Sequence, residues 1–197
     1  MRVFASCARV GGKNAPKSIE KRSKSGENVP FFEAHHFLEN YIKKDRRIHL
    51  GDHLTFLFEN TETIKYQIQE MVRTERIVRE SDILHEIKTY NELLGEKGSL
   101  GCTLLIEISD SEQRDQLLKK WLSLPKHIYL ILENGKRTYA EFDSRQVGEN
   151  RLSSVQYLKF NCEGQNPIKI GCDHENLDIE TPLKEEQKAA LSKDLQA

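Results

Sequence analysis

The chain has 197 residues and a formal net charge of −1, with 37% hydrophobic and 31% charged residues. This length suits one ordinary domain that buries a hydrophobic core. The hydrophobic fraction excludes a chain that is disordered throughout. No apolar run approaches the ~20 residues that a membrane-spanning helix needs, so we expect a soluble protein with no membrane partner.

The charge is unevenly distributed along the chain. Residues 1–29 contain seven Lys and Arg against two Glu, a net charge of +5, so the remainder carries −6. A negative body repels a polyanion, so nucleic-acid binding would depend on the N-terminal segment, and we do not expect nucleic acid as a partner. We interpret residues 1–29 as a disordered basic tail or an over-long start, with a targeting segment as an open alternative. Residues 30–197 are predicted to form a single domain.

The four cysteines, Cys7, Cys102, Cys162 and Cys172, are scattered, and no two of them have CxxC spacing. Scattered cysteines without a secretory signal peptide suit the reducing cytosol better than a disulfide framework. The sequence therefore predicts a cytoplasmic protein with free thiols.

The first half of the chain predicts three helices and one strand. Apolar residues at helical spacing favour helices at 31–45, 61–79 and 81–94. Asn60 is a suitable N-cap for the second helix, and Gly95 is a suitable stop for the third. Before Asn60, Leu54, Phe56 and Phe58 alternate with other residues in the manner of a half-buried strand.

The second half is richer in strands. We predict strands at 102–108, 154–160 and 168–171, a helix at 109–124 opened by a Ser109–Glu112 capping box, and a terminal helix at 184–195. The clearest element is a hairpin, in which strands at 128–132 and 137–142 flank Asn134-Gly135, the dipeptide preferred in type I′ turns. Because few helices separate these strands, we predict an α+β fold with a mostly antiparallel or mixed sheet and helices packed on one side.

The predicted helix at 61–79 carries a carboxylate where an aliphatic residue is expected. At about 100° per residue, Glu75 falls within the apolar stripe of Ile64, Ile68 and Met71. A buried carboxylate must be paired, hydrogen-bonded or protonated, and Arg79 stands one turn later. We therefore predict that Glu75 is largely buried.

Other residues extend this candidate site. Glu70 and Arg73 are spaced for an ion pair, with Tyr66 nearby on the same helix. Glu107 on the strand at 102–108 also needs a partner if both faces of the sheet are covered, and Arg145 has the right chemistry. Such pairs either lock the helix in place or line a pocket. The candidate polar site comprises Tyr66, Glu70, Arg73, Glu75, Glu107 and Arg145.

Patterns for metals, cofactors and nucleophiles are incomplete. Glu33 and His36 have the Glu-x-x-His spacing of di-iron helices, but no second copy occurs. Cys172-x-His174 together with Cys162 offers three residues that can bind zinc, with only one short spacing. The sequence has no Gly-x-Ser-x-Gly elbow, P-loop or Gly-x-Gly-x-x-Gly cradle. We expect no cofactor and no metal.

Two adjoining blocks, RIHLGDHLTFLFEN (47–60) and YQIQEMVRTERI (66–77), resemble an uncharacterised, mainly bacterial domain-of-unknown-function family with the core pattern LTxLFEN…YQIQEMxRxERI. Further matches are TLLIE (103–107), SSVQYLKF (153–160), IGCDH (170–174) and ALSKDL (190–195). The similarity covers residues 32–195 and departs at Gln156, where many members carry His. Genes of the family often lie beside those for rubrerythrin and iron–sulfur oxidoreductases, which implies redox or oxidative-stress work.

No complete catalytic constellation accompanies this resemblance. We therefore expect a non-catalytic accessory or partner-binding module, whose partner would be a rubrerythrin-like or iron–sulfur protein. The alternative is an enzyme or small-molecule-binding protein with a Glu/Arg-lined pocket. Side chains gathered around one concave pocket would favour the alternative, and separate ion pairs would favour the accessory module.

Overall fold

The computed structural model describes residues 38–196, and the strands in this range form two four-stranded sheets. The first sheet, in the order β1-β2-β3-β6, contains β1 (Arg47–Leu50), β2 (Leu54–Glu59), β3 (Ser99–Ile106) and β6 (Val155–Asn161). The second sheet, in the order β5-β4-β7-β8, contains β4 (Ile128–Leu132), β5 (Arg137–Tyr139), β7 (Pro167–His174) and β8 (Leu177–Pro182). Every strand pair is antiparallel, and the predicted α+β class is confirmed. The strands β1 and β8 and the division into two sheets were not predicted from the sequence.

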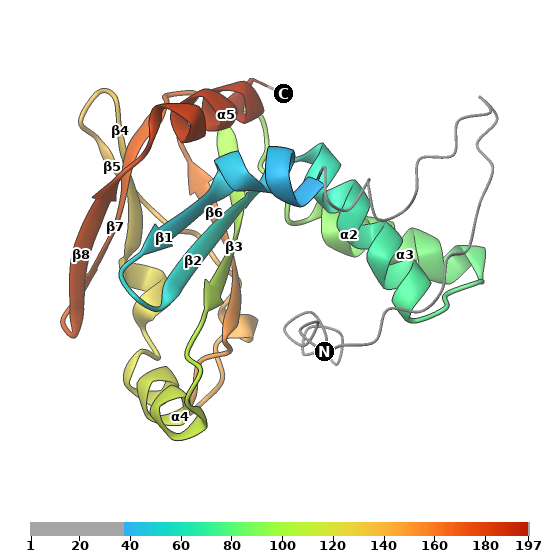
Figure 1. Ribbon diagram of the computed structural model, residues 1–197, viewed down its shortest axis with the longest axis horizontal. Coiled ribbons are helices and arrows are strands. Elements are labelled where there is room, and N and C mark those ends of the chain that lie inside the picture. Colours follow the sequence, from blue (N-terminus) through green and yellow to red (C-terminus); the bar gives the residue numbers. More distant parts are fainter. Residues whose placement is uncertain (1–37, 197) are drawn as a thin grey trace.

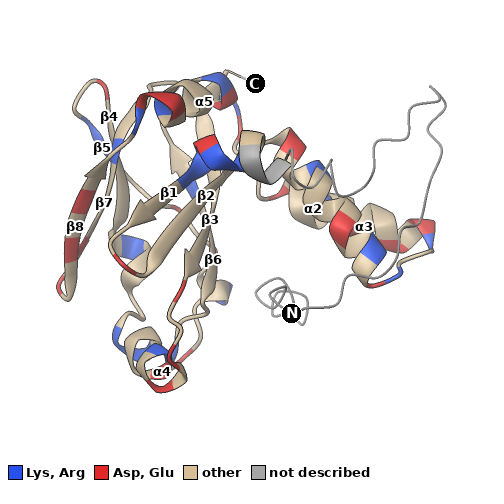
Figure 2. Cartoon of the chain, in the orientation of Figure 1, with Lys and Arg blue, Asp and Glu red and all other residues tan. Residues whose placement is uncertain are grey.

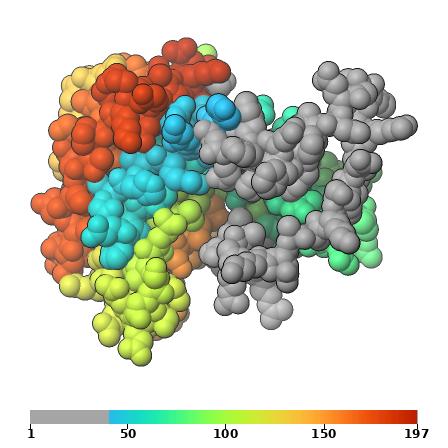
Figure 3. Space-filling model, in the orientation of Figure 1, coloured from blue at the N-terminus to red at the C-terminus, as the bar shows by residue number. Residues whose placement is uncertain are grey.

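The two sheets pack face to face and nearly close into a flattened barrel (Figure 1). At one seam, β1 and β8 are in contact, and Figure 3 shows the atoms of the first strands meeting those of the C-terminal segment. At the other seam, Glu141 follows β5 and pairs with Lys159 of β6. Each edge strand is therefore shielded by the other sheet, which protects its backbone from pairing with other chains.

One hydrophobic core fills the space between the sheets. Phe56, Phe58 and Leu104 point into it and are fully buried, and each such side chain contributes about 1.5–3 kcal/mol when removed from water. The opposite face of β2 is buried as well, including Thr55 and Glu59. The prediction of a half-buried strand was wrong here, because both faces of β2 are covered.

The described residues include four α-helices, and Figure 1 shows that they are arranged in two ways around the barrel. The helices α2 (Thr61–Thr74) and α3 (Glu80–Asn91) form a hairpin that projects from the first sheet. The helices α4 (Ser111–Lys120) and α5 (Glu185–Leu195) lie at opposite ends of the barrel, where Leu118 and Leu191 complete the core. Figure 2 shows that acidic and basic residues are interspersed on these helices.

The hairpin between β4 and β5 forms where the sequence predicts it, but with a different turn. Gly135 has a φ of +79°, whereas Asn134 is not in the positive-φ region that a type I′ turn requires at both central positions. The Gly135 amide donates to the Leu132 carbonyl oxygen over 2.8 Å. This geometry matches a type I turn followed by a left-handed glycine, so the type I′ prediction was wrong.

The helix that opens at Asn60 ends earlier than the periodicity predicts. The Asn60 side chain accepts a hydrogen bond from the Thr63 amide over 2.9 Å, which confirms the predicted N-cap. The helix stops at Thr74, and Arg76 has a left-handed φ of 53°. Residues beyond Thr74 therefore do not follow the helical projection from which Glu75 was assigned to the apolar stripe.

Two other helix boundaries also differ from the sequence predictions. The helix α4 is capped by Asp110, which accepts from the Gln113 amide over 2.7 Å, instead of by Ser109. Within the predicted 31–45 helix, the described part consists of a π-helical turn (Leu38–Lys43) and a 3-10 turn (Lys44–Arg46). The predictions for residues 1–29, Glu33 and His36 lie outside the described residues.

Candidate functional site

A buried ion pair joins the start of the described chain to its C-terminal helix. The Arg46 guanidinium donates from Nε to Asp194 Oδ2 over 2.7 Å and from Nη2 to Asp194 Oδ1 over 2.9 Å. The two side chains are only 9% and 10% exposed. Arg46 Nη1 also donates to the Ile42 carbonyl, and Asn60 Nδ2 lies 3.5 Å from Asp194 Oδ1. The pair therefore ties α5 to the segment that precedes the barrel and to the N-cap of α2.

A second buried group, Glu59, stands where β2 passes into α2. Its carboxylate accepts from Thr63 Oγ1 over 2.6 Å and from Thr103 Oγ1 over 2.7 Å, which links it to α2 and β3. Burial raises the pKa of Glu59 above its ordinary value of 4.5, although both hydrogen bonds and the charge of Lys43 act in the opposite direction. Burial raises the pKa of the neighbouring Cys102 thiol as well, with Glu59 adding to the effect, so this thiol is a poor nucleophile.

The raised pKa of Glu59 predicts how the stability of the protein changes with pH. Because the pKa of Glu59 is raised in the folded state, its contribution to stability is fully present below pH 4.5. This contribution is lost as the pH rises through the folded-state pKa. Glu59→Gln keeps the side-chain shape without the charge, so its free energy of unfolding should improve relative to wild type between pH 4 and pH 7. The change amounts to about 1.4 kcal/mol for each unit by which the two pKa values differ. Urea unfolding at several pH values measures it, and Glu75→Gln controls for the loss of a surface charge. A constant difference between Glu59→Gln and wild type would contradict the assignment.

Because Gly101 has no side chain, the backbone at the base of the hairpin packs directly against the first sheet. A Cβ atom at Gly101 would lie 1.8 Å from the Leu93 carbonyl oxygen and 3.0 Å from the Gly95 nitrogen. The backbone after α3 thus touches β3, beside the position where Gly101 pairs with Glu59 and Lys159. The ion pair, the Glu59 network and this contact fix the base of the hairpin to the barrel.

The hairpin has a small core of its own. Ile64 and Met71 of α2 pack with Tyr90 of α3, and all three side chains are buried. The outward side is different, since Val78 is 88%, Leu84 58% and Ile87 36% exposed. In the described residues, these are three of the five large hydrophobic side chains that are exposed; the other two are Tyr41 and Tyr139. Among the described residues, the hairpin therefore carries most of the exposed large hydrophobic side chains.

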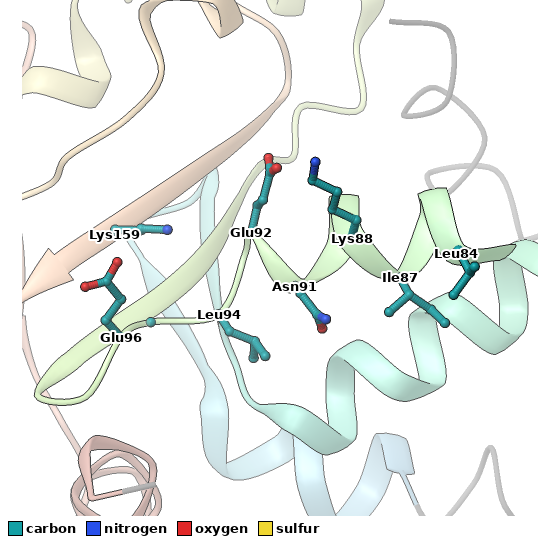
Figure 4. Close-up of a pocket in the computed structure, with 9 residues that line it drawn as sticks. Leu84, Ile87, Lys88, Asn91, Glu92, Leu94, Glu96 and Lys159 are labelled. Atoms are coloured by element: carbon teal, nitrogen blue, oxygen red, sulfur yellow. The ribbon is translucent and has the colours of Figure 1, made fainter. Parts of the chain in front are cut away.

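Two hollows flank the end of α3. Figure 4 shows the first, of about 570 Å³, with Leu84, Ile87 and Leu94 along it and the charged side chains of Lys88, Glu92, Glu96 and Lys159 around it. The second, of about 660 Å³, lies between α3, the outer face of β6 and the segment after β5. Tyr90, Phe142 and Tyr157 are among its lining residues. Glu92 and Lys159 line both hollows, so the two adjoin at the point where α3 meets the sheet.

The structure does not bring the six sequence-predicted site residues together. Glu70 and Arg73 form an ion pair of 2.8 Å on the surface of α2, as their spacing predicts. Tyr66 lies one turn before Glu70 on the same helix, with Lys43 Nζ 5.5 Å from its ring centroid. Glu75 follows the last residue of α2 and is exposed, so the prediction of its burial was wrong. The helical projection assumed that the helix continues past Glu75. Because α2 ends at Thr74, the projection does not give the direction of the Glu75 side chain.

The other two candidates lie on different elements. Glu107 follows β3 and accepts from Thr55 Oγ1 over 2.5 Å, while His49 Nδ1 lies 2.9 Å from the same hydroxyl. Arg145 is paired with Asp143 two residues earlier, over 2.5 Å. Within residues 38–196, no hydrogen bond or ion pair joins Glu107 to Arg145. The Glu/Arg-lined pocket proposed from the sequence is therefore not formed by these six side chains.

The polar side chains around Asp173 and the buried cysteines are both accounted for by their surroundings within the protein. On the outer face of the second sheet, Asp173 accepts from Tyr139 Oη over 2.6 Å and is paired with Arg137 and His127. The hydrogen bond from Tyr139 contributes most to lowering the pKa of Asp173, so this carboxylate is held in its charged form.

Burial raises the pKa of Cys162 to about 12 and that of Cys172 to about 11. The part of the chain that the structure describes contains no group of three His, Cys, Asp or Glu residues arranged to hold a metal.

Sequence reasoning missed the polar residues that matter most to the architecture. Arg46 and Asp194 are 148 positions apart, and nothing local marks them as partners. Glu59 did carry a signal, because it shares a strand face with Thr55 and Leu57 and immediately precedes the N-cap of a helix. An acid at that position can hold both the strand and the helix start.

The polar groups at the base of the hairpin lie within the part of the chain that matches a family model. The family model "Protein of unknown function (DUF3501)" matches residues 39–195, which is most of the chain. The chain belongs to the DUF3501 family. Glu59 and Asn60 lie in the LTFLFEN block and Asp194 in the ALSKDL block, so in this DUF3501 protein these blocks serve to anchor the hairpin.

A solved structure supports the same architecture. The chain is similar to a novel protein of unknown function from Burkholderia pseudomallei K96243, with 29% sequence identity and a TM-score of 0.75. The match covers 83% of this DUF3501 chain and 90% of the other. No curated protein matches this chain. Among the described helices, none has both the length and the apolar character needed to cross a membrane.

Proposed function

We propose that this DUF3501 protein is a non-catalytic accessory module that binds a protein partner through the tip of its α2–α3 hairpin. The observation that carries the proposal is that the most exposed large hydrophobic side chain of the described residues stands at the tip of a projecting, anchored hairpin. Val78, at 88% exposure, lies at the tip between Arg76 and Arg79. Protein interfaces combine an apolar centre with arginine, and arginine is among the residues that contribute most to binding.

The anchoring of the hairpin supports a docking role. The Arg46–Asp194 pair, Glu59 and the close contact at Gly101 hold the hairpin base in one orientation. A surface that is ordered before binding loses less conformational entropy when the partner arrives. Arg76, with its left-handed φ of 53°, adds a strained backbone position at the tip, and such positions concentrate at functional sites.

The partner class follows from the family resemblance. Because genes of similar proteins often lie beside those for rubrerythrin and iron–sulfur oxidoreductases, we propose a rubrerythrin-like or iron–sulfur protein as the partner, and the cytoplasm as the location. The separation of the six candidate site residues favours this role over the enzyme alternative, which required them to line one pocket.

Partner capture with a tip variant tests the proposal. Tagged wild-type protein should retain one or more iron-containing proteins from native lysate, and Val78→Asp should reduce their recovery by about tenfold, because a charge replaces the apolar contact. Gln165→Asp places the same charge on an exposed loop of the second sheet and should retain the partner. Both changes are at exposed positions, so melting temperatures should agree with wild type. Equal recovery by Val78→Asp and wild type, or no specific recovery by wild type, would overturn the proposal.

A further inference from the structure

The second hollow, between α3 and the outer face of β6, has the size and the fixed walls of a small-molecule site. Its volume of about 660 Å³ lies within the range of about 300–1,000 Å³ that ligand pockets occupy. One wall is the end of α3, and the opposite wall is formed by residues 141–146. The wall at α3 is held in place by the close backbone contact at Gly101.

The wall at residues 141–146 is held against β6 by two sets of hydrogen bonds. The amides of Glu141 and Lys159 each donate to the carbonyl oxygen of the other residue over 2.8 Å. The Tyr157 amide donates to Gln146 Oε1 over 2.7 Å, and Gln146 Nε2 donates to the Tyr157 carbonyl oxygen over 3.4 Å. Because both walls are fixed, a ligand would not have to order them when it binds.

The charged side chains in the lining of this hollow are Glu92, Glu141, Asp143 and Lys159. Asp143 is paired with Arg145, whose Nε donates to the Asp143 carboxylate over 2.7 Å. Within residues 38–196, the side chains of Glu92, Glu141 and Lys159 make no hydrogen bond or ion pair. Two carboxylates and one ammonium group are therefore available to a ligand.

The available charges of opposite sign stand side by side. Glu141 and Lys159 form a hydrogen-bonded antiparallel pair, which places their Cα atoms about 5.5 Å apart and their side chains on the same face. Figure 4 shows the Lys159 side chain beside Glu92 and Glu96, where the two hollows adjoin. Glu96 belongs to the lining of the first hollow, together with Lys88 of opposite charge.

This arrangement selects for a ligand that carries both charges close together. An α-amino acid has its ammonium and its carboxylate on one carbon atom. The carboxylate can accept from Lys159, and the three donors of the ammonium are sufficient for both Glu92 and Glu141. A ligand with charge of one sign alone would meet a repulsive contact in the same hollow.

Apolar surface lies next to these charges. Leu93 follows Glu92 at the end of α3, and Val155 stands on the same face of β6 as Lys159, because the two are an even number of residues apart. Tyr157 lies between them on that face and also lines the hollow. A ligand with an apolar side chain would cover this surface, whereas glycine would leave it in water.

We infer that the second hollow binds a free α-amino acid with an apolar side chain. Lys159 receives the carboxylate, Glu92 and Glu141 receive the ammonium, and the side chain lies over Val155 and Leu93. The six residues of the sequence-predicted site take no part in this lining. The hollow is at the end of α3 that is remote from the hairpin tip, so this inference does not depend on the partner proposed for Val78.

Isothermal titration calorimetry of the full chain with L-phenylalanine and with L-leucine provides the test. At least one of them should bind with a dissociation constant on the order of 0.1–1 mM, a value suited to so small a ligand. Phenethylamine lacks the carboxylate and phenylpropionate lacks the ammonium, so each should bind about tenfold more weakly than L-phenylalanine. Glycine should bind more weakly than either amino acid, because it has no side chain. If neither amino acid produced heat at about 10 mM, or if phenylpropionate bound as well as L-phenylalanine, the inference would be overturned.

Lys159→Met locates the carboxylate in the hollow. Methionine keeps the apolar stem without the ammonium group, so the variant should bind L-phenylalanine and phenethylamine equally, and the preference of about tenfold should disappear. Glu141→Gln should weaken both ligands by about threefold, because both carry an ammonium group. Lys126→Met, at an exposed position of the barrel, is the matched control and should keep the preference. Melting temperatures show whether the variants fold. A Lys159→Met protein that folds and keeps the preference would also overturn the inference.

Discussion

Replacing Arg46 with alanine is expected to lower the free energy of unfolding by about 3–5 kcal/mol, because it leaves Asp194 as an uncompensated buried charge. The guanidinium and the carboxylate share two hydrogen bonds of 2.7 and 2.9 Å and are both about nine-tenths buried. Removal of either partner should have a similar effect. Urea denaturation followed by circular dichroism measures the loss, and Arg73→Ala is the matched control, since its ion pair with Glu70 is on the surface.

The double variant Arg46→Met/Asp194→Leu distinguishes the net contribution of the ion pair to stability from the cost of leaving one buried charge without its partner. Apolar replacements of similar length remove both charges, so much of the stability lost in Arg46→Ala should return. The recovered free energy of unfolding is measured under the same conditions as for the single variants. If Arg46→Ala were no less stable than Arg73→Ala, the pair could not be the anchor that joins α5 to the barrel.

Introducing a single methyl group at Gly101 should be the second most damaging change. A Cβ at this position would lie 1.8 Å from the Leu93 carbonyl oxygen, and neither backbone segment can move without separating the hairpin from the sheet. We expect Gly101→Ala to reduce stability by about 3 kcal/mol, at the upper end of the usual cost of overpacking. Hydrogen exchange should also become faster in α3, because the helix loses its seat on β3.

Gly164→Ala distinguishes this steric effect from a general cost of replacing glycine. Gly164 has a φ of +73° with nothing within 4 Å of an added Cβ, so only its backbone conformation opposes alanine. That penalty is about 1–2 kcal/mol, and exchange in α3 should not change. Equal stability losses and equal exchange in the two variants would show that the hairpin does not depend on contact at Gly101.

Both predictions concern the attachment of the α2–α3 hairpin to the barrel. This attachment connects the buried polar groups with the proposed binding role of the hairpin. Glu59 and the Arg46–Asp194 pair stand at the base of α2, at the opposite end of this helix from Val78. Their side chains are occupied by hydrogen bonds within the protein, which leaves them unsuited to direct contact with a partner. We propose that they hold the orientation of the surface that the partner would meet.

Local chemistry was sufficient to place most elements of the fold. Alternating apolar residues located β2 and β6, Asn60 located the start of α2, and Asn134-Gly135 located the β4–β5 connection. Each of these signals depends on residues a few positions apart, so a single sequence contains the information. The same limit explains the error at Glu75, since helical periodicity gives the direction of a side chain only while the helix continues.

The sequence by itself determined the α+β class, the order of most strands and helices, the N-cap of α2 and the pairing of Glu70 with Arg73. Only the tertiary structure decided that β2 is buried on both faces, that Glu59 accepts a hydrogen bond from Thr103, and that Arg46 meets Asp194. The physical reason is the range of the interactions. Caps, turns and surface pairs join neighbours in the chain, whereas burial and the partner of a buried charge depend on segments that folding brings together from more than 40 residues away.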